Sequence, residues 1–578
     1  MKTTKGISET VVIIFVILIS IVSIGLFSIT VFPIIKKSPI SEVPCSLALR
    51  DLSIDVESGY TCFNYSDSSF IVRVKKRSED VNYTGVKFSL LYKNRDPIFI
   101  KFSESFEKNS FKVFKIQNVQ DRKNLVGLEL YPIIKIENEE KECPLSSRIT
   151  LDDSSFYCEK FIFGRTLEEY EEYEKQKERE RREEEIKSLF AGGKGTPTDP
   201  FQIENCQQLQ NIKYALDSHF ILNNDIDCSE TRNWNNGKGF EPLGNSSSPF
   251  NGSFNGNGKN ISNIFINRST ESYVGLFGYA NNSKIYNLQI EGKVIGFSSV
   301  GFILGSGSFS NITSTKIKGE INGLAFVGGI IGYSLGGIRL ENVSFEGEIN
   351  SSNFAGGLIG YGREFLINFS YANATLISNG NNLGGLIGFH SSNLQNSSIV
   401  LSSYSLGQII GKNSIGGFIG YSEGNLTVSD CYSRTKVIGE SNIGGFIGTL
   451  NNLSFSTSEG SGEDSPLVIE VGRIQKSYSA GFVSGSSNVG GFIGEFSGGE
   501  ILSSFFDVDS SKETDACGKG NCPSGIQGKT TEEMKNILIY EDAGWDIEID
   551  LTSSLNDGYP YLGWQEGNKE HVWFITLT

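Results

Sequence analysis

The stretch Val327-Gly328-Gly329-Ile330-Ile331-Gly332 is one copy of a hexapeptide that recurs along the second half of this 578-residue chain. Further copies close at Gly360, Gly388, Gly420, Gly448 and Gly494, and degenerate first copies close at Gly278 and Gly305. Successive closing glycines are mostly 27 or 28 residues apart, with one spacing of 32 and a last one of 46. A fixed period in this range predicts a solenoid, in which each repeat forms one turn that stacks on its neighbours.

The residue types within a repeat predict that the turns are built from β-strands. Each repeat contains β-branched residues, glycines and polar turn residues, and it shows no helical period. Adjacent turns of a β-solenoid lie ~4.8 Å apart, which brings equivalent residues into ladders. Two interior ladders are predicted from strand parity. The first is Phe277, Leu304, Ile331, Ile359, Ile387, Ile419, Ile447 and Ile493, and the second is Val300, Val327, Ala355, Leu383, Ile415, Ile443 and Val489.

The position before the first ladder is also apolar, although simple alternation of a strand would expose it. Its members are Leu276, Ile303, Ile330, Leu358, Leu386, Phe418, Phe446 and Phe492. Either the Gly-Gly step is bulged and turns this residue inward, or another segment covers that face. We favour the bulge, because paired glycines allow a bend or a close backbone approach that a side chain would obstruct.

The repeats and their flanking segments resemble proteins that carry GLUG motifs. Before the repeats, Asp199-Pro200-Phe201-Gln202-Ile203 is similar to the opening of such arrays, and Gly558-Tyr559-Pro560-Tyr561-Leu562 is similar to their end. The resemblance covers roughly residues 191–565 and implies a capped β-solenoid. It divides this part of the chain into a solenoid opening with an N-terminal cap at 191–272, the repeat solenoid at 273–499, and a C-terminal cap and tail at 500–578. It also implies a stalk or adhesive module, as in bacterial and archaeal surface adhesins and in immunoglobulin-A-cleaving peptidases.

The N-terminal region, residues 1–37, predicts a retained membrane helix. Residues Thr10 to Ile35 carry no charge, and these 26 positions would span roughly 39 Å as a helix. A removable secretory signal would have a shorter apolar run followed by a small-residue cleavage site. We therefore expect a single-pass protein of the cell membrane whose remaining residues are extracellular.

The residues before this helix resemble a type IV pilin-like signal, particularly its archaeal form. The resemblance rests on Lys5-Gly6-Ile7-Ser8-Glu9 directly before the apolar run. It implies cleavage between Gly6 and Ile7, with the helix kept on the mature chain. A plain single-pass anchor is the alternative.

Cysteines and sequons are compatible with an extracellular location. Eight of the 9 cysteines form close pairs in sequence, which predicts local disulfides in an oxidising compartment and leaves Cys431 over, although sequence does not decide connectivity. The disulfide candidates are Cys45, Cys62, Cys143, Cys158, Cys206, Cys228, Cys517 and Cys522. The N-glycosylation candidates are Asn64, Asn82, Asn260, Asn311, Asn342 and Asn425.

Two further regions separate the predicted membrane helix from the solenoid. Residues 38–164 contain short alternating segments such as Ser69–Lys75, separated by turn residues, which predicts a small β-sandwich that acts as a spacer. Residues 165–190 are rich in Glu, Lys and Arg and contain neither Gly nor Pro, which predicts a solvated spacer helix with i,i+4 charge pairs. Coiled-coil pairing is a weaker alternative, because no apolar seam persists along the segment.

The sequence supplies few groups for catalysis or metal binding. His219, His390 and His571 are far apart in sequence, and no HExxH motif occurs. Glu291, Glu320 and Glu348 fall near equivalent places in successive turns, which predicts a solvated outer row of carboxylates. Asp507 opens an acidic stretch that lacks the glycine and spacing of an EF-hand. We therefore predict no enzymatic activity, no metal and no cofactor.

The function predicted is a membrane-anchored cell-surface adhesin or pilin-like structural protein. Its expected partners are the membrane, a surface protein or glycan ligand, and copies of itself. The net charge of −16 argues against nucleic acid, because phosphate binding needs clustered Lys and Arg. A carbohydrate-active β-helix enzyme and a passive envelope component are the alternatives.

Overall fold

The computed structural model describes residues 42–56, 61–64, 68–77, 81–119, 121–136, 139–151, 167–392, 397–451, 472–567 and 570–576. The chain divides into two compact units, Met1–Glu180 and Arg181–Thr578. The predicted membrane helix lies outside the described residues. Within those residues, no helix combines the length and the apolar character needed to cross a bilayer.

The first unit contains a β-sandwich of two antiparallel sheets. One sheet consists of β1 (Leu52–Ile54), β2 (Cys62–Asn64), β3 (Ser69–Lys76) and β6 (Phe111–Ile116). The other consists of β4 (Tyr83–Tyr92), β5 (Ile98–Phe102), β7 (Leu125–Ile136), β8 (Glu139–Glu142) and β9 (Ser147–Thr150). One shared core contains side chains from both sheets and from helix α3 (Glu42–Asp51), and alternate residues of the strands contribute to it. Val72, Phe88 and Leu128 are among them. The alternation in the sequence therefore reflects two sheet faces packed together.

The disulfides of the first unit are not local. Cys45, in α3, bonds to Cys143, 98 residues away, with their Cα atoms 5.3 Å apart. The expected pairing between sequence neighbours is wrong here, because the sandwich brings the beginning and end of the domain together. Cys62 is also disulfide-bonded, while Cys158 lies outside the described residues.

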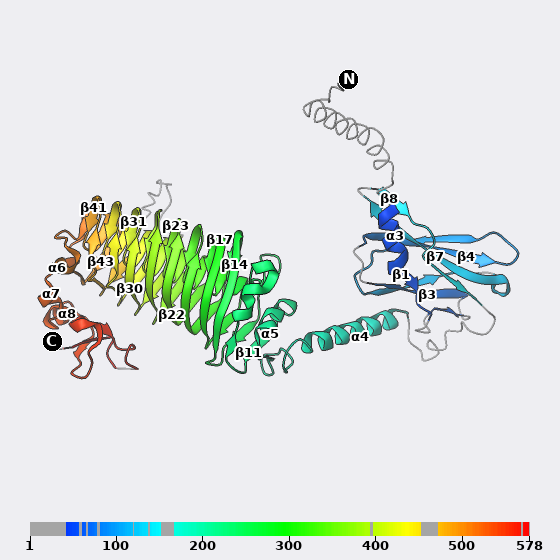
Figure 1. Cartoon of the computed structure of the whole chain (residues 1–578), viewed down its shortest axis with the longest axis horizontal. Coiled ribbons are helices and arrows are strands. Elements are labelled where there is room, and N and C mark those ends of the chain that lie inside the picture. The colour runs from blue at the N-terminus through cyan, green and yellow to red at the C-terminus, as the bar shows by residue number, and fades with distance from the viewer. Residues whose placement is uncertain are drawn as a thin grey trace, which may run out of the picture. The chain divides into compact units, whose positions relative to one another are not determined.

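Helix α4 spans Leu167–Lys187 and is followed by residues that belong to the core of the second unit. Charge pairs such as Lys187–Glu184, at 2.7 Å, lie on its exposed surface. Phe190 follows the helix and stacks on Phe201 at a centroid distance of 4.6 Å. The solvated helix is therefore followed directly by a residue that packs on the core of the first solenoid turn (Figure 1).

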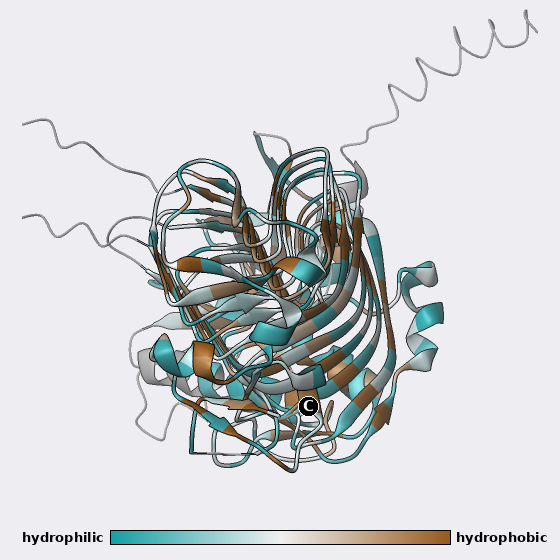
Figure 2. Ribbon diagram, turned by 90° about the vertical axis from the view of Figure 1, so that its left-hand side faces the viewer, coloured by the Kyte–Doolittle hydropathy of each residue, from teal (hydrophilic) through white to brown (hydrophobic). Residues whose placement is uncertain are grey.

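The second unit is a parallel β-solenoid of about 11 turns. A 28-stranded sheet runs from β10 (Phe201–Ile203) to β46 (Ile526–Lys529) and covers more than one side of each turn. A 9-stranded sheet forms the remaining side. It consists of β15 (Phe277–Asn281), β18 (Leu304–Ser308), β21 (Ile331–Gly336), β24 (Ile359–Gly362), β28 (Ile387–Ser391), β32 (Ile419–Glu423), β37 (Ile447–Asn451), β42 (Ile493–Phe496) and β45 (Cys517–Lys519). Figure 2 shows hydrophobic residues recurring at similar places on successive turns.

The predicted ladders are confirmed by the strand register. Ile331 pairs with Ile359 and Ile359 pairs with Ile387, and all eight members of the first ladder are fully buried. The second ladder is buried as well, apart from Val489, which is half-buried near the end of the solenoid. Because each turn contributes one such residue, burial continues along the whole axis of the solenoid.

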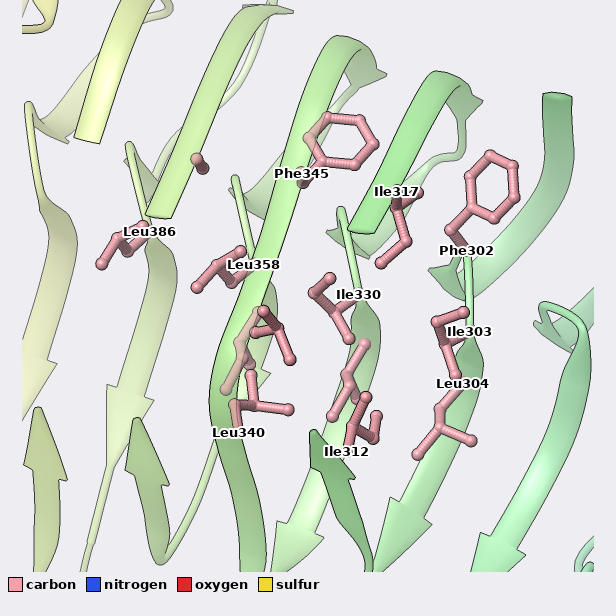
Figure 3. Close-up of a cluster of buried hydrophobic side chains, with 14 of the residues drawn as sticks. Phe302, Ile303, Leu304, Ile312, Ile317, Ile330, Leu340, Phe345, Leu358 and Leu386 are labelled. Carbon is pink, nitrogen blue, oxygen red and sulfur yellow. The ribbon is translucent and has the colours of Figure 1, made fainter. Parts of the chain in front are cut away.

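The Gly-Gly step turns the residue before the first ladder inward, as the sequence predicted. The step is a corner at which the chain leaves β20 (Ala325–Gly328) in the large sheet and enters β21 in the small one. Ile330 therefore lies at the inside of the corner, and the equivalent Ile303, Leu358 and Leu386 line up with it (Figure 3). The chain changes sheets here, which is a larger change of direction than the expected bulge.

Close packing explains why the corner requires glycine. A Cβ atom at Gly329 would lie 2.0 Å from the carbonyl oxygen of Gly357 and 2.4 Å from the Phe345 ring. A Cβ at Gly332 would lie 2.3 Å from the Val300 amide nitrogen. No side chain fits at these distances, so the repeated glycines allow adjacent turns to approach each other.

Another corner is built by residues with left-handed backbone conformation. These residues are Ser314, Asn342, Phe369, Ser402, Asp430, Lys476 and Ser503, with φ between 42° and 56°. Serine, asparagine and aspartate tolerate this region because their short polar side chains bond locally, whereas phenylalanine does not gain from it. The stack of neighbouring turns therefore imposes the conformation at Phe369.

The leftover cysteine, Cys431, lies in a buried ladder of mostly hydroxyl side chains that follows this corner. Ser403 and Ser477 occupy the same position in the turns before and after it, and all three are fully buried. The Ser403 hydroxyl donates to the Leu401 carbonyl at 2.6 Å, and the Cys431 thiol contacts the Ser429 carbonyl at 3.2 Å. Cys431 therefore substitutes for a serine in a repeated structural role.

The predicted outer row of glutamates is correct for Glu320 and Glu348 and wrong for Glu291. Glu291 pairs across strands with Lys318, whereas Glu320 pairs with Lys293 and Glu348. The Lys293 ammonium lies 2.6 Å from the Glu320 carboxylate, and this hydrogen bond is the main reason that the pKa of Glu320 is lowered. The row therefore runs from Lys293 through Glu320 to Glu348, and the lysine offsets part of the repulsion between the two neighbouring carboxylates.

The C-terminal residues do more than close the end of the solenoid. The last turn is closed by β44 (Ser504–Asp507), α6 (Val508–Ser511), β45 and β46. The chain then folds back beside the preceding turns through α7 (Thr531–Met534), α8 (Leu538–Asp542), β47 (Ile547–Ile549), β48 (Tyr561–Leu562) and β49 (Trp573–Ile575). We call residues 531–567 and 570–576 the clasp, and Figure 1 shows it in red beside the last turns.

Candidate functional site

One side of the solenoid carries a row of stacked tyrosines that the clasp covers. Tyr371, Tyr404, Tyr432 and Tyr478 lie at the same place in successive turns, in β26 (Tyr371–Ser378), β30 (Tyr404–Ile410), β34 (Tyr432–Ser433) and β39 (Tyr478–Ser479). Their ring centroids are 4.8, 4.8 and 5.2 Å apart and their planes differ by 2° to 4°. Since each ring covers the face of the next, this covered ladder presents ring edges and hydroxyl groups outward.

The clasp binds the covered ladder through its tryptophans and its backbone. Trp564 donates its indole N–H to the Ser402 carbonyl at 2.8 Å, and Trp573 donates to an Asp430 carboxylate oxygen at 3.0 Å. The Tyr478 hydroxyl donates to the Pro560 carbonyl at 2.6 Å. The left-handed corners and the tyrosine hydroxyls thus act together as a binding surface for a polypeptide segment.

Asp507 has a structural role at the base of the clasp. It caps α6 by accepting the backbone N–H of Asp509 at 2.8 Å and of Ser510 at 2.9 Å. The hydroxyls of Ser510, Thr531 and Tyr559 also donate to it. Burial alone would raise the pKa of Asp507, but these hydrogen bonds outweigh burial and lower it. The carboxylate therefore joins the clasp to the last turn.

Metal-ligating side chains are not clustered. Within the described residues, no group of three or more His, Cys, Asp or Glu side chains is arranged to hold a metal.

A second row of stacked aromatic rings lies on the 9-stranded sheet and is partly exposed. Tyr333, Tyr361, Phe389 and Tyr421 have centroids 4.7, 5.2 and 4.8 Å apart and planes that differ by 6° or 7°. We call these four residues the open ladder. They are half-buried, and the clasp residues that cover the first row pack in a separate cluster.

The open ladder is extended sideways by aromatic residues and at one end by amides. Phe326 packs edge-on against Tyr333 at 5.4 Å and stacks on Phe354 at 5.1 Å. In later turns the position of Phe326 is taken by Asn382, Ser414, Asn442 and Asn488, and Asn488 donates to Asn442 at 2.7 Å. The side of the solenoid therefore changes from aromatic to polar along its axis.

The sequence contains a signal for both rows outside the glycine hexapeptide, which the predicted ladders do not include. An aromatic residue directly follows the closing glycine in Tyr333, Tyr361, Phe389 and Tyr421. A tyrosine also follows the buried serine or cysteine ladder in Tyr371, Tyr404, Tyr432 and Tyr478. These pairs recur with the repeat, so the rows could have been found by aligning the turns.

A shallow depression lies at the beginning of the solenoid. It has a volume of about 380 Å³ and is lined by Tyr214, Asp217, Ser247, Ser248 and Asn251 among others. Tyr214 is 57% exposed, and the other four side chains are exposed as well. Aromatic, carboxylate, hydroxyl and amide groups therefore converge on one accessible place.

The three histidines stay apart in the structure. His390 is fully buried, with its ring nitrogens 2.9 Å from the Ser422 hydroxyl and 3.0 Å from the Ser398 hydroxyl, and burial lowers its pKa to about 3. His219 lies 2.8 Å from the Ser253 hydroxyl. On the clasp surface, His571 lies 2.6 Å from Asp546, whose hydrogen bond raises the pKa of the imidazole.

The modification candidates differ in their accessibility. Asn82 and Asn342 are exposed, and Asn260 and Asn311 are half-buried. Asn425 is only 4% exposed, so the folded turn leaves no room for a glycan there. The Asn64 side chain and the cleavage candidates Gly6 and Ile7 lie outside the described residues.

The disulfides of the second unit join sequence neighbours. Cys206 bonds to Cys228, 22 residues away, and fastens α5 (Cys206–Asn211) to the following turn. Cys517 bonds to Cys522 in the last turn. Cys431 is the free cysteine among the described residues, and burial raises the pKa of its thiol well above its ordinary value.

Comparison with known proteins identifies two relatives that match a limited part of the chain. A predicted Gly-rich membrane protein of Evansella cellulosilytica is 38% identical over 122 residues, which is 21% of this chain and 14% of that protein. Halomucin of Haloquadratum walsbyi is 38% identical over 130 residues, which is 21% of this chain and 1% of that protein. No protein-family model matches the chain, so the GLUG and pilin-like assignments stay predictions.

Two solved structures resemble the chain at low similarity. A predicted immunoglobulin A1 protease of Bacteroides ovatus has a TM-score of 0.32 and 18% identity, covering 65% of this chain and 96% of that structure. A second structure, named IgA1 protease, has a TM-score of 0.32 and 12% identity, covering 70% of this chain and 29% of that one.

The names of these structures correct one prediction. The expectation that the chain has no enzymatic activity does not stand, because both solved structures are named as proteases. At this similarity they assign neither a catalytic residue nor a reaction to this chain. What the comparisons and the fold give together is a β-solenoid chain, similar over a fifth of its length to a protein named as a Gly-rich membrane protein.

Proposed function

We propose that this chain is a membrane-anchored cell-surface adhesin that presents its solenoid for attachment. A single helix at residues 10–35 holds it in the membrane, with pilin-type cleavage between Gly6 and Ile7. The disulfides at Cys45 and Cys206 and the name of the Gly-rich membrane relative support an extracellular location for the folded units.

The observation that carries the proposal is the open ladder. The covered ladder has the same stacked geometry and binds a polypeptide segment through ring edges, hydroxyls and corner groups. The open ladder presents the same kinds of groups, half-buried, on another side of the solenoid. Aromatic residues such as tyrosine are enriched at binding interfaces, because the ring offers a large apolar area and the hydroxyl a polar end.

Attachment of cells that display the full chain tests the adhesin function. We expect the doubly substituted variant Tyr361→Ser with Phe389→Ser to attach less to protein-coated and glycan-coated surfaces than the wild type. The matched control is Phe309→Ser, which removes a ring that is 66% exposed at a different corner. Equal attachment of wild type, variant and cells without the protein would reject the adhesin function and favour a passive envelope component.

N-terminal sequencing of the mature chain tests the anchor separately. A mature chain that begins at Ile7 supports pilin-type processing. A chain that begins at Met1 and fractionates with membranes rejects that processing and favours a plain anchor.

A further inference from the structure

We propose that the depression at Tyr214 is a saccharide-binding pocket, an inference that rests on the adhesin function and names its ligand class. Its volume of about 380 Å³ lies at the lower end of the range for small-molecule sites, which is roughly 300–1,000 Å³. The pocket lies at the first turns of the solenoid and is separate from both aromatic ladders.

The polar groups of the pocket match the hydroxyl groups of a sugar. The Asn251 side-chain amide donates to one Asp217 carboxylate oxygen at 2.9 Å, which fixes the two side chains against each other. Within the described residues, the second Asp217 oxygen and the Asn251 amide oxygen make no hydrogen bond. Two neighbouring acceptors of this kind can bind adjacent hydroxyls of one pyranose ring.

The apolar part of the pocket is the Tyr214 ring. The ring is 57% exposed, although a ring of this size is usually covered on folding. The Lys213 ammonium lies 5.3 Å from its centroid and also pairs with Glu241 at 2.8 Å. An exposed tyrosine beside hydrogen-bonding groups offers a surface for the C–H groups of a sugar.

The walls of the pocket are held in place before a ligand binds. The backbone N–H groups of Asn251 and Gly252 both donate to the Leu216 carbonyl at 3.1 Å, which joins the two loops. The backbone N–H groups of Ser247 and Ser248 donate to the Asn245 side chain at 2.9 and 3.0 Å. The serine hydroxyls are therefore presented by a fixed turn, which reduces the entropy lost on binding.

The composition of the pocket disfavours other small ligands. The Lys213 ammonium is paired with Glu241, so it is not free to bind a phosphate group. A phosphate in the pocket would also be repelled by the Asp217 carboxylate. A single carboxylate is too few for a calcium ion, which takes six to eight oxygen ligands. A neutral polyhydroxylated ring satisfies the carboxylate, amide and hydroxyl groups together.

Saturation-transfer NMR with the full chain and a panel of sugars tests the pocket. The probes are galactose, mannose, glucose and N-acetylglucosamine. We expect at least one of them to bind the wild type, and we expect Tyr214→Ala to weaken that binding by about tenfold or more. Tyr214→Phe should keep the binding, because it keeps the ring. Phe309→Ala is the matched control for removal of an exposed ring and should leave binding unchanged.

Asp217→Asn provides a second variant at an exposed position, where loss of folding is not expected. It should weaken binding because an amide accepts fewer hydrogen bonds than a carboxylate. Absence of binding by all four sugars, or equal binding by wild type and Tyr214→Ala, would overturn the pocket. Cell attachment separates the two proposals. If the chain supports attachment but Tyr214→Ala binds sugar as well as the wild type does, only the pocket is rejected. If the chain binds sugar but does not support attachment, only the adhesin function is rejected.

Discussion

At the residue scale, the repeated glycines are required by the distance between neighbouring turns. A Cβ at Gly357 would lie 2.0 Å from the Gly385 carbonyl oxygen and 2.5 Å from the Ala372 Cβ. We expect Gly357→Ala to destabilise the solenoid by about 1–3 kcal/mol, the usual cost of overpacking. Chemical denaturation followed by circular dichroism measures the change. Gly192→Ala is the control, because its nearest neighbours are side-chain atoms of Gln202 at 3.1 Å, which can move.

The identity of residue 431 is predicted to matter little as long as it donates a hydrogen bond. Cys431→Ser should change stability by less than about 1 kcal/mol, because serine fills the same ladder in the turns on either side. Cys431→Val should cost more, since it removes the donor from a fully buried polar ladder. The native thiol should resist alkylation and react only after denaturation; rapid labelling of the folded chain would contradict its burial.

The burial of His390 predicts that the folded chain loses stability in mild acid. Its folded-state pKa of about 3 lies below the unfolded value of about 6.5, so between these limits the unfolded chain binds a proton that the folded chain excludes. The free energy of unfolding therefore falls as the pH decreases through this window, by up to about 1.4 kcal/mol per pH unit. The difference between wild type and His390→Gln, measured by denaturation from pH 7 to pH 4, should shrink on acidification. A constant difference would contradict this assignment.

At the element scale, the clasp is held by tryptophans that contact residues of separate turns. Trp573 is fully buried against Tyr432 and Tyr478 and donates to Asp430. Trp573→Ala should cost about 3–5 kcal/mol and release the clasp, because it empties a large buried volume. Limited proteolysis should then cut within residues 531–576 before it cuts the solenoid.

The conservative variant Trp573→Phe separates packing from hydrogen bonding. It keeps an aromatic ring but loses the indole N–H, so we expect a cost of about 1–3 kcal/mol for leaving the Asp430 carboxylate without this donor. Equal protease sensitivity of both variants would mean that the hydrogen bond, and not the ring, holds the clasp.

At the scale of the whole molecule, two separate cores predict two unfolding transitions. The sandwich core and the solenoid core share no residue. Replacing Cys45 and Cys143 with alanine should lower only the sandwich transition, by about 2–5 kcal/mol, since this disulfide closes a loop of 98 residues. Replacing Cys517 and Cys522 with serine is the control, because they are 5 residues apart and close a short loop. Calorimetry of the full chain distinguishes the transitions, and a single shared transition would contradict independent units.

The solenoid could be predicted in detail because the information is repeated and local. The period sets the turn, strand parity selects Ile331 and Val327 as interior residues, and the glycines mark the corner. Spacing placed Glu291 in the row of Glu320 and Glu348, although Lys293 holds that position, because register within a turn depends on bulges and corners that spacing alone does not reveal. A shift of one or two residues along a strand changes which charges face each other.

The sequence by itself determined that residues 273–499 form a β-solenoid with continuous apolar ladders, because each turn repeats the same local pattern and neighbours stack in register. Only the tertiary structure decided that Cys45 meets Cys143, that the clasp covers one tyrosine ladder and leaves another open, and that Tyr214 meets Asp217 and Asn251 in a pocket. Most of these contacts join residues far apart in the chain: Trp573 and Asp430 are separated by 143 positions. No periodic signal encodes such pairs, since each occurs once and depends on where the folded turns bring the backbone.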